Sequence, residues 1–169
     1  HNEIEDFFFF FLENIKVLAE STATKDAILE IDAANMAAKA RLGTTGTDLL
    51  ADEEYRTAYE KWDTYFSHYV EEYGYYDLFL ICPEDGDVYY TVAQEADFGT
   101  ELSEENTHLA TTWERALSHN DAVFSDTEAY APSNGDAALF VACPVTHNSE
   151  TIGVVALQIG QNHIDEIMQ

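Results

Sequence analysis

The chain has 169 residues, enough for one domain with a substantial hydrophobic core, and its 46% hydrophobic and 13% aromatic content is typical of a folded protein. Only 7 Lys and Arg residues stand against 33 Asp and Glu residues, which gives a net charge of −26. This balance argues against binding to nucleic acid or to anionic lipid, because both require Lys and Arg side chains. The charge indicates instead a solvated acidic surface suited to saline surroundings.

The first segment predicts a helix with a wide apolar face. Five apolar residues recur at spacings of four and three and form one stripe: Ile4, Phe8, Phe11, Ile15 and Leu18. Phe7 and Phe10 widen this stripe. A helix of this kind buries its apolar surface in its own domain, on a second copy of the chain, or on both. Core packing and a parallel homodimer seam are therefore both open from the sequence.

Two more helices are predicted before residue 75. Residues 24–42 form a weaker helical stretch that ends at Gly43, and a loop rich in Gly and Thr follows it. Residues 52–73 form a long helix that Gly74 is expected to close with a left-handed cap. We expect its aromatic stripe to lie in the core: Tyr55, Tyr59, Trp62, Phe66, Tyr69 and Tyr73.

The strongest local signal is a β-hairpin that follows Gly74. Residues 75–82 are rich in β-branched and aromatic side chains with almost no polar alternation, as expected for an inner strand covered on both faces. The turn at 83–86 contains Asp85-Gly86, which is typical of hairpins, and residues 87–92 form the second strand.

The rest of the chain predicts one helix, three strands and a final helix. A polar connection at 93–102 leads to a helix with Ser103 as its N-cap. Strands are expected at 121–125, 137–145 and 151–159, with a loop at 126–136 and a helix from Ile164. This order predicts an α+β fold: a five-stranded antiparallel sheet with the long N-terminal helices on one face and a short helix with loops on the other.

No pattern in the sequence indicates catalysis, a metal or a cofactor. A Gly-x-Ser-x-Gly elbow is absent, and Cys143 with His147 lacks an orienting partner. The histidines do not have metal-ligand spacing. The acidic residues around Gly99 do not match a calcium loop, so we expect a solvated acidic loop there: Glu95, Asp97, Glu101, Glu104 and Glu105. Cys82 and Cys143 lie in apolar strand segments and are expected to be buried free thiols.

A small-ligand pocket is the kind of site that the sequence favours. Such sites combine an apolar cavity with a few placed polar groups. Large or polar side chains are expected between the sheet and the helix that starts at Ser103: Tyr90, Trp113, Asp126, Tyr130 and Phe140. Strand register decides whether Tyr89 or Tyr90 faces this space. Packing of the same residues into the core is the alternative.

The charges near the expected pocket favour a ligand that is neutral or carries an amine. After Lys61 the only Lys or Arg is Arg115, so this half of the chain has few groups to neutralise a buried anion. An ammonium group could pair with Asp126 and stack on Tyr or Trp rings. A carboxylate ligand would depend on Arg115, on backbone N–H groups, or on Arg56 and Lys61.

Seven segments of the chain, taken together, carry a resemblance to a known family: Tyr75-Tyr-Asp-Leu-Phe-Leu-Ile81, Asp85-Gly-Asp-Val-Tyr-Tyr-Thr-Val92, Asp97-Phe-Gly-Thr100, Phe124-Ser-Asp126, Tyr130-Ala-Pro-Ser-Asn-Gly135, Phe140-Val-Ala-Cys-Pro-Val145 and Ile152-Gly-Val-Val-Ala-Leu-Gln-Ile159. They resemble Cache domains, the PAS-like extracytoplasmic sensor modules of bacterial methyl-accepting chemotaxis proteins and sensor histidine kinases. The resemblance covers residues 75–169, and the long helix before them fits the pattern. Of the pocket residues, only Asp126 falls where a family carboxylate meets an amine.

The resemblance implies a PAS-like sensor core at 75–169 that forms one domain with the helical region at 1–74. It also implies a periplasmic or extracellular position between two transmembrane helices of an inner-membrane receptor. The apolar run at 7–12 is too short to cross a bilayer, and the chain starts without Met, so we expect a piece of a longer protein. The alternatives are a module that transmits the state of a partner without binding a ligand and, less favoured, a small enzyme.

Overall fold

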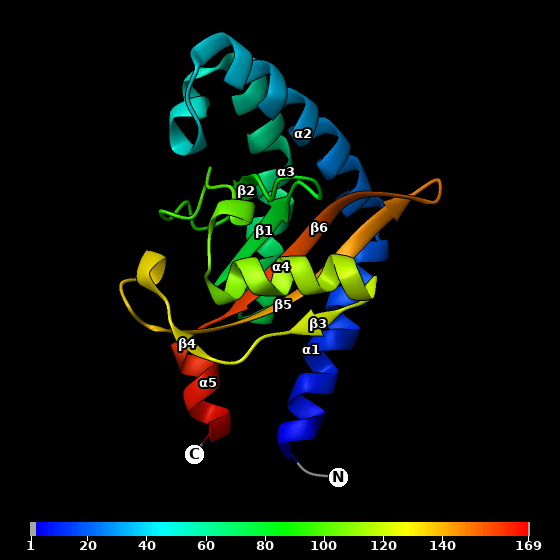
Figure 1. Ribbon diagram of the computed structural model, residues 1–169, viewed down its shortest axis with the longest axis vertical. Helices are drawn as coiled ribbons and strands as arrows, with labels where there is room; N and C mark the ends of the chain where they lie inside the picture. The colour runs from blue at the N-terminus through cyan, green and yellow to red at the C-terminus, as the bar shows by residue number, and fades with distance from the viewer. Residues whose placement is uncertain (1–2, 169) are drawn as a thin grey trace.

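The computed structural model describes residues 3–168 as an α+β fold in which one sheet lies between two helical layers (Figure 1). Residues 1, 2 and 169, which the predicted ranges 1–74 and 75–169 include, lie outside the described residues. The helices are α1 (Glu3–Glu20), α2 (Thr22–Leu42), α3 (Glu53–Tyr73), α4 (His108–His119) and α5 (Gln161–Met168). The free ends of α1 and α5 extend from the same end of the molecule (Figure 1).

The sheet is antiparallel, with strand order β2-β1-β6-β5-β3 and a further strand, β4, that pairs with β5. The strands are β1 (Asp77–Ile81), β2 (Val88–Thr91), β3 (Val123–Phe124), β4 (Glu128–Ala129), β5 (Ala137–His147) and β6 (Glu150–Ile159). The five predicted strands and the α+β class are confirmed, and β1 is an inner strand. The sixth strand, β4, lies within the predicted loop at 126–136, because a two-residue pairing leaves no alternation pattern to detect.

The helices α1, α2 and α3 cover one face of the sheet. On α1, Phe11, Ile15 and Leu18 are buried against this face, so this part of the apolar stripe is core. Ile4, at the start of the same stripe, is 45% exposed. A homodimer seam on α1 therefore stays a prediction, and it would use surface outside the core.

The predicted caps and aromatic core of α2 and α3 are largely confirmed. Gly43 and Gly74 close the two helices in the left-handed conformation. The N-cap of α3 is Asp52, whose carboxylate accepts the backbone N–H of Tyr55 at 3.0 Å. Hydrogen bonds from Arg41 lower the pKa of Asp52 to about 2. The aromatic stripe lies in the core or packs against it except at its last residue, Tyr73, which is exposed.

The helix α4 covers the other face of the sheet (Figure 1), and it starts later than predicted. Its N-cap is Thr107, whose side chain accepts the backbone N–H of Ala110, and Ser103 lies instead in a short 3-10 turn. Tertiary contacts explain the later start of the helix. The backbone N–H of Leu102 donates to the carbonyl oxygen of Gly86, and Glu101 forms a β-bridge with Asp87. These contacts hold the segment against the β1–β2 hairpin before the helix can begin.

Both cysteines are free, as predicted; Cys143 is buried and Cys82 is half-buried. None of the helices described between residues 3 and 168 combines the length and apolar composition needed to cross a membrane.

A contact between two glycines positions the loop at 92–101. An added Cβ on Gly99 would lie 2.5 Å from the backbone nitrogen of Gly46 and 2.6 Å from its Cα, and Gly99 has a φ of +86°. Only a residue without a Cβ allows the two backbones to approach this closely. The 92–101 loop is thereby fixed to the segment that links α2 to α3.

Replacing Gly99 by Ala is expected to lower the free energy of unfolding by about 2 kcal/mol, because the substitution adds both a backbone clash and an unfavourable φ. Gly43→Ala is the matched control, since Gly43 has a φ of +66° and nothing within 4 Å of the added Cβ. The free energy of unfolding of this control should fall by only about 1 kcal/mol. Urea unfolding of both variants measures the difference, and equal losses would contradict the role given to the Gly46–Gly99 contact.

Candidate functional site

Tyr90 lies on the opposite side of the sheet from Trp113, Tyr130 and Phe140. A β-bulge in the pairing of β1 with β2 leaves Tyr89 as an extra residue, so strict alternation is lost there. Tyr89 and Tyr90 both pack in the core beneath α1, α2 and α3, and the Tyr90 hydroxyl donates to Asp63 of α3 at 2.6 Å. The prediction that one of these tyrosines faces the α4 side is wrong, because the bulge removes the alternation on which it depended.

Trp113, Tyr130 and Phe140 share the core layer between the sheet and α4, as predicted. The rings of Tyr130 and Phe140 meet edge to face, with centroids 4.9 Å apart. The indole N–H of Trp113 donates to the carbonyl oxygen of Cys82 at 3.1 Å. The three side chains line none of the cavities described below, and their role in binding a ligand stays a prediction.

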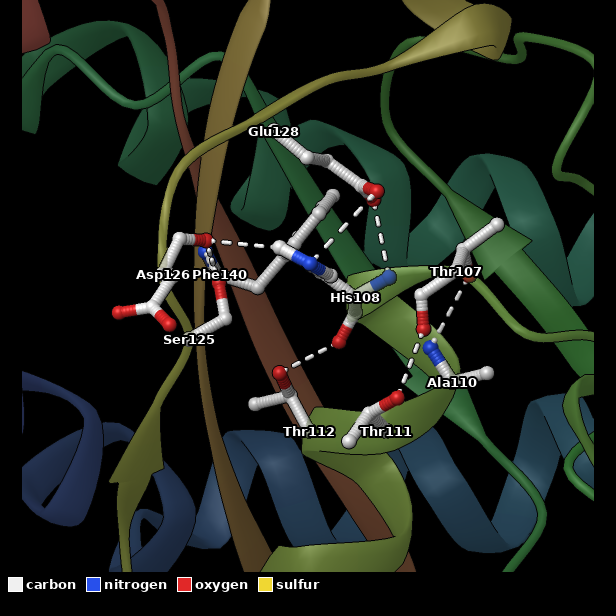
Figure 2. A network of polar contacts seen from close by, with 9 residues as sticks. All are labelled: Thr107, His108, Ala110, Thr111, Thr112, Ser125, Asp126, Glu128 and Phe140. Atoms are coloured by element: carbon white, nitrogen blue, oxygen red, sulfur yellow. Dashed lines mark hydrogen bonds and ion pairs between the residues drawn. The ribbon is translucent and has the colours of Figure 1, made fainter.

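Asp126 belongs to a hydrogen-bonded segment that faces the first turn of α4 (Figure 2). The backbone N–H of His108 donates to Glu128 Oε1 at 2.9 Å, and the His108 ring Nδ1 lies 3.0 Å from the carbonyl oxygen of Asp126. The Ser125 hydroxyl donates to that same carbonyl oxygen at 2.8 Å and accepts the backbone N–H of Phe140 at 2.9 Å. These bonds attach the segment to both α4 and β5.

The carboxylate of Asp126 is exposed and points away from His108 (Figure 2). Pairing of β4 with β5 fixes the segment after Asp126 and leaves the carboxylate at the surface. A cleft of about 120 Å³ lies on the α4 side, and Arg115 at its rim donates to the carbonyl oxygen of Phe124 at 3.0 Å. The structure therefore does not bring Asp126 together with the three buried aromatic residues.

A different carboxylate, that of Asp77, lies in the layer between the sheet and α4. Asp77 is the first residue of β1 and is fully buried. Its Oδ1 accepts the backbone N–H groups of Leu78, Val92 and Ala93 at 2.8, 3.0 and 2.9 Å, whereas its Oδ2 has no hydrogen-bond partner among the described residues. Burial raises the pKa of Asp77 well above its usual range, and the three N–H donors oppose this shift in part.

Asp97 brings a second buried carboxylate to the same place. The sequence predicted a solvated acidic loop here, and for Asp97 this is wrong, since only 3% of the residue is exposed. The Tyr130 hydroxyl donates to its Oδ2 at 2.9 Å, and its Oδ1 has no partner among the described residues. Burial raises the pKa of Asp97 to about 6, although the bond from Tyr130 lowers it in part. The charge of Asp97 also raises the pKa of Asp77.

Gln158 supplies a third unpartnered oxygen. It pairs with Asp77 across β1 and β6 and with Phe140 across β5 and β6, so the three side chains share one face of the sheet. Its Nε2 donates to the Ser133 hydroxyl at 3.0 Å, and Ser133 donates to Glu95 at 2.8 Å. Its Oε1 has no partner among the described residues.

Asp77, Asp97, Tyr130 and Gln158 are called the buried acidic cluster below. The cluster presents three unpartnered acceptor oxygens beside the aromatic rings of Phe140 and Tyr130. Unpartnered buried acceptors are unfavourable, and a donor that reaches them gains the full strength of a hydrogen bond in a low dielectric. A primary ammonium group carries three N–H donors and a positive charge. It could therefore donate one hydrogen bond to each of the three oxygens and pair with the two carboxylates.

A metal ion does not fit the site equally well. Within residues 3–168, no group of three or more His, Cys, Asp or Glu side chains is arranged to hold a metal ion. Two carboxylates with single free oxygens and one amide give fewer hard ligands than Ca²⁺ needs. The arrangement therefore favours an organic cation.

Removal of the Tyr130 hydroxyl should raise the pKa of Asp97 above about 6, because the hydrogen bond stabilises the ionised carboxylate. The variant Tyr130→Phe tests this, with ¹³C NMR of the Asp97 carboxyl carbon followed as a function of pH. Tyr76→Phe is the control, since that hydroxyl donates to Glu95 and not to Asp97. An unchanged pKa in Tyr130→Phe would contradict the assigned hydrogen bond.

Sequence reasoning missed Asp77, Asp97 and Gln158 for different reasons. Asp77 and Gln158 are single polar residues within strands that are otherwise apolar, and this could have marked them as buried polar groups. Asp97 has no such signal, because it is one of several acidic residues in a loop and its burial depends on loop packing.

Comparison with known proteins adds a structural similarity. No protein-family model matches the sequence, and no curated protein does. The sensor domain of the histidine kinase DctB from V. cholerae superimposes with a TM-score of 0.64 at 13% identity, covering 98% of this chain and 54% of that one. This chain thus spans about half of the DctB sensor domain. The similarity shows a shared fold and confirms the predicted Cache-like architecture.

Two chemoreceptor domains give lower scores. The ligand-binding domain of Campylobacter jejuni Tlp3 in complex with L-norvaline has a TM-score of 0.49 at 12% identity and covers 92% of this chain and 62% of that one. The ligand-binding domain of the Pseudomonas aeruginosa amino acid chemoreceptor PctC in complex with GABA has a TM-score of 0.44 at 15% identity. This similarity covers 93% of this chain and 62% of that one.

Proposed function

We propose that this chain is a ligand-sensing domain of a transmembrane receptor and that it binds a small molecule carrying a primary amine at the buried acidic cluster. The observation that carries the proposal is the set of three unpartnered acceptor oxygens, on Asp77, Asp97 and Gln158, together with the absence of Lys and Arg from the buried residues that the structure describes. The fold shared with a sensor domain supports the same reading.

The ligand should enter beneath the loops at 92–101 and 130–136. These loops supply Asp97 and Tyr130, whereas the sheet supplies Asp77 and Gln158. An ammonium group bound between them would neutralise the two carboxylates, and the rings of Tyr130 and Phe140 would contact the rest of the ligand. A dicarboxylate would meet two acidic groups and no basic partner, so we expect it to be rejected.

The position of the cluster connects it to the helices at the end of the domain. Asp77 lies a few residues after the end of α3, and Gln158 lies a few residues before the start of α5. The backbone N–H of Tyr76 donates to the carbonyl oxygen of Gln158 at 2.9 Å, which ties the two chain segments together. A ligand that draws Asp77 and Gln158 toward it would therefore bias the packing of α3 and α5.

The proposal includes a periplasmic or extracellular position and membrane anchors beyond α1 and α5. It also includes a homodimer through α1, for which the supporting observation is exposed apolar surface: Phe9 is 65%, Phe10 55% and Val17 70% exposed. The same surface favours the second candidate function, a module that transmits the state of a partner protein and binds no small ligand.

A thermal-shift screen tests the proposal. The panel contains primary amines, amino acids, dicarboxylates and divalent metal salts, each added to the wild type and to Asp97→Asn. Ligand binding to the folded state raises the apparent melting temperature by mass action. We expect at least one amine to stabilise the wild type and to stabilise Asp97→Asn much less. Stabilisation by dicarboxylates alone, or equal stabilisation of both proteins by every amine that binds, would contradict the proposed site, and no response at all would favour the partner-transmission candidate.

A further inference from the structure

A second cavity lies between the first and last helices, away from the buried acidic cluster. It has a volume of about 200 Å³ and is lined by residues of α1, of the 125–127 segment, of β5 and of α5. Phe7 and Phe8 come from α1, Leu139 from β5 and Ile164 from α5. The ring of Phe8 also stacks on Phe124, with centroids 4.4 Å apart, which holds the α1 wall against β3. The cavity therefore has mainly apolar walls contributed by separate elements.

The polar edge of this cavity is acidic. Among the described residues that line it, Asp126 is the only charged one, and Ser125 and Thr127 are its polar neighbours. The Asp126 carboxylate points away from the α4 side (Figure 2), where its backbone carbonyl is already bonded to His108 and Ser125. The nearby cation, Arg115, donates to the backbone carbonyl of Phe124. A ligand in the cavity would thus meet apolar surface on most sides and one carboxylate.

We propose that this cavity binds a primary amine that carries one aromatic ring on a short chain. The ring would lie between Phe7, Phe8 and Ile164, and the ammonium group would pair with Asp126. Size supports this class of ligand: an apolar cavity of about 150 Å³ is known to bind benzene, so a slightly larger one has room for a ring with a two-carbon chain. Charge supports it as well, because an anion would face the Asp126 carboxylate without a basic partner.

Such a ligand would lie between α1 and α5 and couple its binding to the distance between them. It would contact both helices and the 125–127 segment at once, so its binding free energy would depend on their separation. This site is independent of the buried acidic cluster, and the proposal does not rest on ligand binding there.

Calorimetric titration with 2-phenylethylamine tests the proposal, at low ionic strength because salt weakens the pairing of exposed charges. We expect the neutral analogue 2-phenylethanol to bind about fivefold more weakly, the change that loss of one partly exposed ion pair gives. Ethylamine, which lacks the ring, should not bind measurably. The methyl NMR signals of Leu139 and Ile164 should shift on addition of 2-phenylethylamine.

Four variants locate the binding. Asp126→Asn should bind 2-phenylethylamine about fivefold more weakly, as expected for loss of the ion pair. Glu150→Gln, an exposed change of the same charge in the β5–β6 hairpin, should bind like the wild type. Thr127→Trp fills the cavity from an exposed position and should abolish binding. Asp97→Asn should leave this binding unchanged even if it abolishes ligand binding at the buried acidic cluster. Equal affinity of Asp126→Asn and wild type, or an absence of shifts at Leu139 and Ile164, would overturn the proposal.

Discussion

Asp77→Ala is expected to have a free energy of unfolding about 3 kcal/mol lower than that of Asp77→Asn, because it removes an acceptor shared by three backbone N–H groups. In the native protein Asp77 Oδ1 accepts from Leu78, Val92 and Ala93 within 3.0 Å. The N–H of Val92 keeps a second acceptor, the carbonyl oxygen of Leu78 at 3.2 Å, so the loss falls mainly on the other two donors.

The Asn variant serves as the reference because its amide oxygen can accept the same three bonds. It also avoids the burial of a carboxylate whose pKa is raised, so the comparison isolates the hydrogen bonds from the charge. Urea unfolding of both variants at one pH gives the difference directly. Equal stability of the two would show that Asp77 does not anchor the turn at 91–93.

Asp97→Asn is expected to be more stable than the wild type at pH 7 by about 3 kcal/mol and equally stable below pH 4. Burial raises the pKa of Asp97 in the folded state to about 6, against about 3.9 for an unperturbed Asp. The folded state therefore holds its proton over a pH range in which the unfolded state has lost it. Linkage then requires the stability of the wild type to fall as pH rises from about 4 to about 6, by about 1.4 kcal/mol per unit of pKa shift.

Unfolding free energies measured at intervals between pH 4 and pH 8 test this prediction. The Asn variant keeps an acceptor for Tyr130 but has no proton to lose at this position. Its free energy of unfolding should therefore not show the decrease between about pH 4 and about pH 6. Asp32→Asn is the control: burial raises the pKa of Asp32 to about 6 as well, but on the α2 side of the sheet. Its effect should add to that of Asp97→Asn without altering it. If the free energies of unfolding of the wild type and Asp97→Asn differ by the same amount at every pH, the burial assigned to the Asp97 carboxyl group is contradicted.

Most of the fold could be predicted because its signals are local. The apolar run of β1, the Asp85-Gly86 turn and the glycine caps of α2 and α3 each follow from a few adjacent residues. The start of α4 could not, because Ser103 has good capping chemistry but is held by contacts with the hairpin. Local propensity was overridden there by pairing with a distant segment.

The candidate site was harder to predict than the fold because its residues depend on register and burial. One bulge residue at Tyr89 reverses the expected face of Tyr90. One close approach, between Gly46 and Gly99, fixes the loop that buries Asp97, and nothing in the acidic sequence around Asp97 distinguishes it from its exposed neighbours. The preference for an amine followed from the scarcity of basic residues, which is a property of composition and does not depend on register.

Binding of an amine at the buried acidic cluster can be observed by ¹³C NMR of the Asp77 and Asp97 carboxyl carbons at pH 7, during titration with the primary amines of the thermal-shift panel. We predict that at least one amine shifts both signals at pH 7, and that both pKa values are lower when the signals are followed against pH with this amine bound, since a bound ammonium group favours the ionised carboxylates. A panel in which no amine that stabilises the protein shifts the two carboxyl signals would contradict this claim.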